Sequence, residues 1–231
     1  MKIIVLGSSA DKGFFHRRGK DRRTRASIAI QNKDKIIVID ASPDFFRQIK
    51  RERIIPDAIF LTHAHIDHIA ALKEKKFNIP VYASRKTWNE MPKKITANCL
   101  NKKIIDKKIN IAGLTIIPFK VDHSDLVTNY GYKIDGLVYI PEQRNLTKKA
   151  KEFMNKATVL VLDGAIMDRD LNVHSSIKTK LKWLPNIKAK KIFFTNIGRN
   201  TAKRTHQELV KYLKNKDKRI DVFYDGKTII T

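Results

Sequence analysis

Short apolar runs rich in isoleucine and valine recur along the chain and predict β-strands in two groups. Runs of this length and β-branched content, bounded by Asn, Asp, Lys or Gly, are typical of buried strands. In the first half they cover residues 3–6, 27–30, 36–39, 58–61 and 80–83. In the second half they cover residues 104–105, 109–111, 114–121, 129–134, 137–140, 158–162, 191–195, 220–224 and 228–230. We expect tight turns at 32–35 and 135–136, and a closing hairpin across 225–227.

Helical segments follow most of these predicted strands. Ser42 is a good N-cap and Pro43 suits the first helical position, so a helix is predicted from there through Ile49 toward Arg53. Further helices are expected at residues 69–76, 85–91, 146–155, 175–183 and 201–214. Strands in two groups, each accompanied by helices, predict an α/β (α+β) fold, a four-layer αββα sandwich formed by residues 1–231 as one domain.

One segment places metal-binding residues directly after a predicted strand. The run 58–61 is followed by Thr62 and then by His63, His65, Asp67 and His68, three histidines and an aspartate within six residues. Imidazole and carboxylate groups bind zinc, iron or manganese and are rarely buried without partners. In a tight loop, His63 and His65 could face one ion, while Asp67 and His68 begin the next helix and face a second. The alternative is a chance cluster in a polar turn.

This HxHxDH pattern resembles the signature of the metallo-β-lactamase fold superfamily, and the resemblance implies further ligands. His123 follows a long predicted strand at the place where phosphodiesterase-like members have a third ligand histidine. The family's bridging aspartate corresponds to Glu142, which could serve with its longer arm or leave no bridge. The family's last ligand histidine corresponds to Asn196, whose carbonyl oxygen is a poor ligand for a soft divalent ion. We therefore expect an intact first site and a second site that is weak, differently built or empty.

Two more residues are expected to act beside the metal. Asp40 ends a predicted strand, and in the family this aspartate orients the metal-binding loop through hydrogen bonds. His174 resembles the histidine of the histidine–serine–threonine block in transfer-RNA 3′-processing nucleases (RNase Z-like) and cyclic phosphodiesterases. It is therefore a candidate general acid, or else it simply precedes a helix capped by Ser175 or Ser176. His16 and His206 fit no pattern and are expected at the surface.

The net charge of +25, from 48 Lys and Arg against 23 Asp and Glu, is extreme. Such a field attracts polyanions, which favours a phosphate-containing substrate, nucleic acid included, although a Lys- and Ile-rich composition would give the same value. A segment after the first strand is dense in arginine and almost free of apolar residues. Because arginine contacts phosphate bidentately, it is either a phosphate-binding loop or a solvated one. Its candidates for substrate phosphate are Arg17, Arg18, Arg22, Arg23 and Arg25.

Short blocks over most of the chain also resemble pyrroloquinoline-quinone biosynthesis protein B. They lie at residues 7–10, 25–29, 40–44, 139–141, 163–164 and 195–197. That family also lacks the usual bridging aspartate, but the cysteine cluster expected near its start is absent here.

The superfamily resemblance implies a metal-dependent hydrolase that uses one or two Zn²⁺ ions, or Fe or Mn. The ion would lower the pKa of a bound water to about 7, and Asp67 would orient that water or bind a second ion. We expect a phosphodiesterase or nuclease. The alternatives are an iron-dependent oxygenase or biosynthetic enzyme like the quinone-cofactor protein, and a basic nucleic-acid-binding protein with a degenerate metal site.

Composition also bears on location. No apolar run approaches 18 residues, so no membrane span is expected. Cys99 is the single cysteine, which rules out an internal disulfide and suits a reducing, cytoplasmic compartment. A homodimer is compatible with the sequence.

Overall fold

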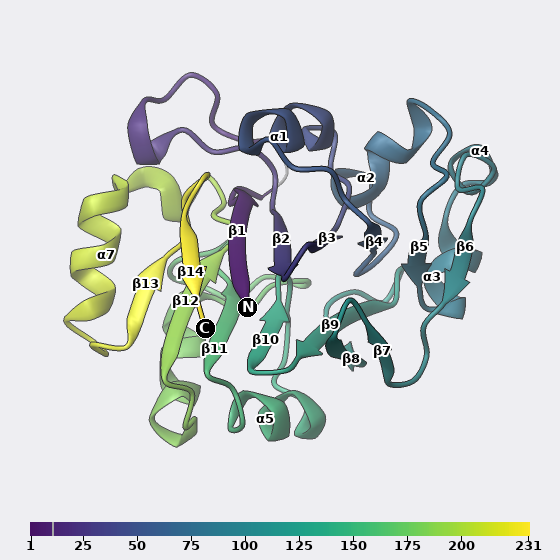
Figure 1. Ribbon diagram of the computed structural model, residues 1–231. Helices are drawn as coiled ribbons and strands as arrows, with labels where there is room; N and C mark the ends of the chain where they lie inside the picture. Colours follow the sequence, from purple (N-terminus) through teal and green to yellow (C-terminus); the bar gives the residue numbers. More distant parts are fainter. Residues whose placement is uncertain (11) are drawn as a thin grey trace.

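The protein is built on two seven-stranded sheets, shown in Figure 1 as a computed structural model that describes residues 1–10 and 12–231. The first sheet is antiparallel from β14 to β3 and parallel from β3 to β6. In the order in which they pair, its strands are β14 (Thr228–Ile230), β1 (Lys2–Gly7), β2 (Ser27–Asn32), β3 (Lys35–Ile39), β4 (Ala58–Phe60), β5 (Val81–Ala83) and β6 (Lys102–Ile104). The carboxyl ends of β3 and β4 therefore meet at one edge, which brings residue 40 beside the segment that follows Phe60.

The second sheet has a parallel half and an antiparallel half. Its strands pair in the order β13 (Ile220–Val222), β12 (Lys191–Thr195), β11 (Val159–Asp163), β10 (Leu137–Ile140), β9 (Asn129–Ile134), β8 (Leu114–Val121) and β7 (Ile109–Ile111). The strands β10 to β13 are parallel, and β7 to β10 are antiparallel. The carboxyl ends of β8, β10, β11 and β12 consequently share one edge of the sheet.

Helices cover the outer faces, which gives the order helix, sheet, sheet, helix that the sequence predicted. In Figure 1, α1 lies above the first sheet and α5 below the second, and α7 packs beside β13. The first half of the chain holds α1 (Phe45–Glu52), α2 (Ile66–Ile69), α3 (Arg85–Glu90) and α4 (Lys93–Thr96), and the second half holds α5 (Lys148–Met154), α6 (Ile177–Trp183) and α7 (His206–Lys214). The αββα prediction is confirmed.

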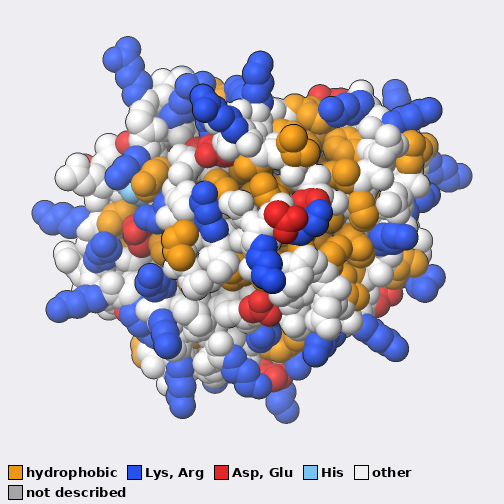
Figure 2. All heavy atoms as spheres, viewed as in Figure 1, with side chains coloured by type: hydrophobic (Ala, Val, Ile, Leu, Met, Phe, Trp, Pro, Cys, Tyr) orange, Lys and Arg blue, Asp and Glu red, His pale blue; other side chains and the backbone are white. Residues whose placement is uncertain are grey.

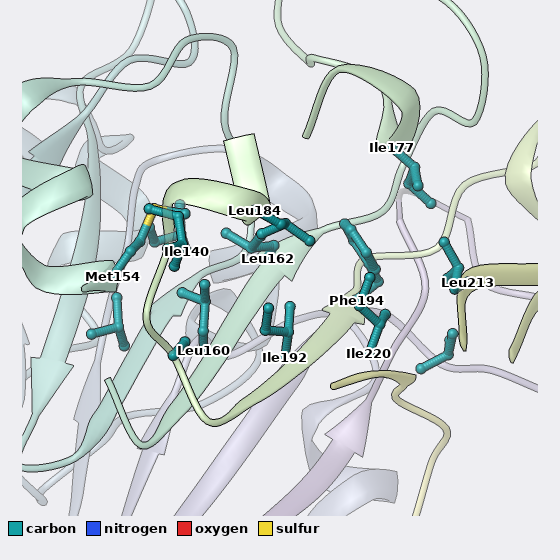
Figure 3. Close-up of a cluster of buried hydrophobic side chains, with 14 of the residues drawn as sticks. Ile140, Met154, Leu160, Leu162, Ile177, Leu184, Ile192, Phe194, Leu213 and Ile220 are labelled. Carbon is teal, nitrogen blue, oxygen red and sulfur yellow. The ribbon is translucent and has the colours of Figure 1, made fainter. Parts of the chain in front are cut away.

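Apolar side chains are buried on both faces of the strands, which explains why the strands read as continuous apolar runs. Within β1, Ile3 faces the layer between the sheets and Ile4 faces the outer layer. Figure 3 shows the outer face of the second sheet, where strand residues pack against side chains of the covering helices. The labelled residues there include Leu160, Leu162, Ile192 and Phe194 from the strands and Met154, Ile177 and Leu213 from the helices.

The predicted closing hairpin is wrong. The strand β13 pairs in parallel with β12 in the second sheet, whereas β14 pairs antiparallel with β1 in the first. The connecting residues carry the chain from one sheet to the other instead of turning it back. Asp225 fixes this crossing, because its carboxylate accepts hydrogen bonds from the Thr24 amide at 2.7 Å and from Ser8 Oγ at 2.9 Å.

The two tight turns are confirmed, since Asn32 pairs with Lys35 and Ile134 with Leu137. Several helix boundaries differ from those predicted. The first helix begins at Phe45, because Ser42 Oγ accepts from the Asp44 amide in a turn ahead of it. The helix expected at 69–76 begins earlier, as α2, and continues as a 3₁₀ turn over residues 70–73.

The helix expected at 201–214 is divided in two. Residues 201–203 form a separate 3₁₀ turn. A capping box of Thr205 and Glu208 satisfies the amides of a new helix end, so α7 begins at His206. The short helix α4 was not predicted. None of the helices in the described part of the chain has the length and hydropathy that crossing a bilayer requires.

Candidate metal centre

The predicted ligands come together at the shared strand edge. Each follows the carboxyl end of a strand, and within each sheet these strands run in the same direction, so the ligands lie at the same edge. Asp40 follows β3, the HxHxDH segment follows β4, His123 follows β8, Glu142 follows β10 and Asn196 follows β12.

Three imidazoles and one carboxylate converge on a single volume. Ligand atoms of His63, His65, His123 and Glu142 all lie within 4.8 Å of one another. Glu142 Oε2 is 3.1 Å from His63 Nε2 and 2.7 Å from His123 Nε2. His65 Nδ1 lies 3.0 Å from His63 Nε2 and 3.9 Å from the same carboxylate oxygen. The three histidines predicted for the first site thus come together, and Glu142, predicted as a possible bridging ligand, lies among them.

A second cluster shares Glu142. The other carboxylate oxygen, Oε1, lies 3.2 Å from His68 Nε2, and Asp67 Oδ2 lies 3.7 Å from the same nitrogen. Asn196 Nδ2 donates to Glu142 Oε1 at 3.1 Å. Glu142 therefore stands between the two clusters, in the place of the family's bridging aspartate, while Asn196 directs an amide N–H toward it.

Asp40 holds the metal-binding loop as expected. Its carboxylate accepts hydrogen bonds from the Thr62 amide at 2.8 Å and from His68 Nδ1 at 2.8 Å, and it is fully buried. His123 is oriented in a similar way, since its Nδ1 donates to the Val173 carbonyl at 2.7 Å. Both imidazoles thus have Nδ1 committed to the scaffold and turn Nε2 toward Glu142, which is the orientation that a metal ligand requires.

Burial sets the protonation of these groups. Desolvation lowers the pKa of His63 to about 3, and the nearby charge of His68 acts in the same direction. Burial also opposes charge on His68, but the carboxylates of Asp40, Asp67 and Glu142 outweigh it and raise the pKa of His68 well above its ordinary value. The pKa of Glu142 lies well below its usual range, because the facing histidines outweigh the effect of burial. His63 is therefore neutral and Glu142 ionised, the forms in which both bind metal.

The donor set fits a divalent cation. Within the described residues, His123 Nε2 and Glu142 Oε2 are buried atoms without an aligned hydrogen-bond partner. Unpaired polar atoms of this kind are costly in a protein interior, and an ion bound between them would remove that cost. Imidazole nitrogens with a carboxylate oxygen form a typical zinc ligand set.

A second group of residues adjoins the centre. His174 lies beside His123, with 5.1 Å between ring centroids, and its Nδ1 is 2.8 Å from Asp163 Oδ2. Asp163 is fully buried and also lies 3.3 Å from the buried Lys180 Nζ. Ser176 caps α6, which confirms one of the two caps considered for this segment.

No sequence pattern predicted a role for Asp163 or Lys180. Asp163 could have been found, because it ends a buried strand as Asp40 does. No sequence signal marks Lys180, which is one of several lysines in a short helix.

The arginine-rich segment is more structural than predicted. Arg23 is buried, with its guanidinium bonded to Ser8 Oγ, to the Phe223 carbonyl and to His206 Nδ1, so its donors are used within the protein interior. His206 is consequently buried as well, against expectation, whereas His16 is exposed as predicted.

Arg25 pairs with Asp44 at 3.1 Å and is half-buried. Arg17 donates to the Ala202 carbonyl, while Arg18 and Arg22 are exposed. The segment's two ends lie close to the centre, since Ser9 forms bridges with both Arg25 and Ile197, the neighbour of Asn196.

Basic side chains are spread over the surface. On the face shown in Figure 2, lysines and arginines project around the whole outline and do not gather in one patch. This distribution agrees with a lysine-rich composition.

An αββα sandwich with histidines and carboxylates at the edge between its sheets defines the class of metallo-hydrolases. The family model for the Beta-lactamase superfamily domain matches residues 35–197, more than half of the chain. The chain therefore belongs to the metallo-β-lactamase superfamily.

Similar proteins support the fold over its full length. A structure described as a new diphosphatase from the PhnP family has a TM-score of 0.87 and 26% identity, and the match covers 100% of this chain and 97% of that one. Zn²⁺-bound PqqB from Methylobacterium extorquens has a TM-score of 0.85 and 19% identity, with both chains covered completely.

One relative is much longer than this chain. An octanoyltransferase from Porphyromonas gingivalis is 25% identical over 218 residues, which are 81% of this chain and 44% of that protein. The chain therefore spans less than half of this relative's length.

Proposed function

We propose that this hydrolase cleaves a phosphodiester with the help of a zinc ion held by His63, His65, His123 and Glu142. The observation that carries the proposal is the convergence of these four ligands within 4.8 Å, next to the Asp163–His174 pair. Metal ligands and a candidate proton donor are the two elements that hydrolysis of a phosphate ester needs.

Each residue has a defined part in this proposal. A zinc ion would lower the pKa of water and polarise the phosphoryl oxygen. Asp67, half-buried beside His68, accepts a hydrogen bond from the attacking water and orients it. His174 donates its Nδ1–H to Asp163, so the ring is held with Nε2 free to give a proton to the leaving oxygen. Asp40 keeps His68 and the loop in place.

A phosphate-containing substrate is supported by three features. The chain carries a net charge of +25, which speeds the approach of anions. Arg17, Arg18 and Arg22 belong to the arginine-rich segment. Its last residue, Arg25, forms a bridge with Ser9, which also forms a bridge with Ile197. The PhnP-family structure is described as a diphosphatase. Nucleic acid is one phosphate-containing substrate of this kind. We also propose a cytoplasmic location, which the free, buried Cys99 supports.

The proposal is tested with zinc-loaded protein and bis-p-nitrophenyl phosphate. We expect turnover that His65→Ala reduces by at least about 100-fold, because one ligand of the ion is lost. His16→Ala is the matched control, since His16 is exposed and far from the ligand set in sequence, and it should retain full activity. Elemental analysis of the same samples identifies the bound metal.

Nucleic acids are assayed in parallel, as single and double strands. No turnover of any phosphodiester by metal-loaded protein would refute the proposal. Salt-dependent nucleic-acid binding that survives His63→Ala, without hydrolysis in the wild type, would instead support a binding protein with a degenerate centre.

A further inference from the structure

We propose that Lys180 is a positioning residue that holds the proton donor His174 in place through Asp163. This inference rests on the proposed function, because it concerns how the leaving oxygen receives its proton. Lys180 is not a candidate metal ligand and lies in the helix α6.

Lys180 contacts both supports of His174. Its Nζ lies 3.3 Å from Asp163 Oδ2, the same oxygen that accepts from His174 Nδ1 at 2.8 Å. The Nζ also donates to the carbonyl of Ser175, the residue directly after His174. The ammonium group therefore fixes the carboxylate that orients the ring and the backbone that carries it.

The other contacts of Asp163 agree with a fixed carboxylate. Its Oδ1 accepts from the Ala165 amide at 2.8 Å, and its side chain is fully buried at the end of β11. With one oxygen held by the backbone and the other shared by His174 and Lys180, the carboxylate has a single orientation. The His174 ring inherits that orientation through its hydrogen bond.

The complete burial of the Lys180 side chain requires an explanation. Lys180 is 0% exposed in a chain whose other lysines are mostly at the surface. Moving an ammonium group out of water is costly, and an apolar residue at such a position is often equally stable or more so. This desolvation cost is explained if the ion pair keeps Asp163 charged and oriented beside the centre.

The chemical consequence concerns the leaving group. During hydrolysis the P–O bond to the leaving group breaks as water adds to phosphorus, and His174 passes its Nε2 proton to the departing oxygen. The proton lost by the water replaces the one given by His174, so the balance is closed. A leaving group that is already a good anion needs this proton little, whereas a poor one needs it greatly.

The test compares bis-p-nitrophenyl phosphate, with an acidic leaving group, and diphenyl phosphate, with a much weaker one. We expect Lys180→Met to lower kcat for diphenyl phosphate by about 10–100-fold while kcat for the nitrophenyl ester changes by less than about 3-fold. KM should change little for either substrate. Lys178→Met, an exposed lysine of the same helix paired with Asp168, is the control and should leave both rates unchanged.

A double-mutant cycle shows whether Lys180 acts through His174. We expect His174→Ala to have the same dependence on the leaving group, and the double variant to be no slower than His174→Ala alone. Equal losses on both substrates, or losses that multiply in the double variant, would overturn the inference. A wild type inactive on both substrates would refute the proposed function itself and this inference with it.

Thermal unfolding and zinc content are measured to check that Lys180→Met is folded. If the unpaired Asp163 carboxylate prevents folding, Asp163→Asn combined with Lys180→Met removes both charges, which costs less than removing one. That variant should show the same selective loss on diphenyl phosphate. Full activity of this variant on both substrates would also overturn the inference.

Discussion

Replacing Arg23 with methionine distinguishes a structural arginine from one that binds substrate. The Arg23 guanidinium donates hydrogen bonds to Ser8 Oγ and the Phe223 carbonyl, and it lies 3.1 Å from His206 Nδ1. Methionine fills much of the same volume but makes none of these bonds. The carbonyl and the imidazole nitrogen would remain buried without partners.

The size of the effect follows from two opposing contributions. Three hydrogen bonds from a charged donor contribute roughly 5–9 kcal/mol in total. Burial lowers the pKa of Arg23 to about 10, although Asp225 opposes this change, and the net shift corresponds to a cost of about 3 kcal/mol for the charged form. The difference leaves a net destabilisation of about 2–6 kcal/mol, or a decrease of about 4–24 °C in Tm for a chain of this size.

The assay is urea unfolding followed by the fluorescence of Trp88 and Trp183, with Arg22→Met as the matched control. Arg22 is exposed, so its replacement should change the free energy of unfolding by less than about 0.5 kcal/mol. If Arg23→Met unfolds at the wild-type urea concentration but weakens binding of a phosphate substrate, Arg23 binds substrate and the structural assignment is wrong.

Three other predictions concern the centre and its surroundings. Asn196→His should raise the zinc content measured by elemental analysis from about one ion per chain to two, because it replaces an amide donor to Glu142 with a metal ligand; an unchanged ratio would contradict this reasoning. Removing zinc with a chelator should lower Tm by about 5–10 °C, since an ion at 100 times its Kd contributes about 2.7 kcal/mol, and an identical Tm with and without the ion would show that nothing binds in the folded state. Burial and the charge of Arg23 lower the pKa of His206 to about 4, below its unfolded value, so stability is full above about pH 6.5 and falls as the pH drops toward 4. Between pH 7 and 4.5, metal-free wild type should lose about 1–2 kcal/mol more than His206→Gln does in urea unfolding, and equal losses would exclude His206 as the titrating group.

Asn196 sets the second cluster apart from the ligand set that the resemblance implied. His68 and Asp67 lie near Glu142, so three candidate ligands of a second ion come together. Asn196 lies where the family's last histidine would be, and its N–H bonds to the carboxylate that both ions would share. The sequence identified this departure, but only the structure shows that the amide donates a hydrogen bond to Glu142.

The order of strands and helices and the αββα class were determined by the sequence, which also predicted that His63, His65 and His123 converge. Strands buried on both faces require continuous apolar runs, and HxHxDH after such a run places ligands at a strand end in any parallel arrangement. These features depend on neighbouring residues, and local patterns report them well.

Pairing between distant segments was decided only by the tertiary structure. Nothing local shows that residues 220–222 and 228–230 join different sheets, that Arg23 and His206 are buried against each other, or that Lys180 meets Asp163 behind His174. Each of these contacts joins residues brought together by the packing of whole layers. Their energies depend on burial and exclusion of water, which a sequence pattern does not record for a single polar residue.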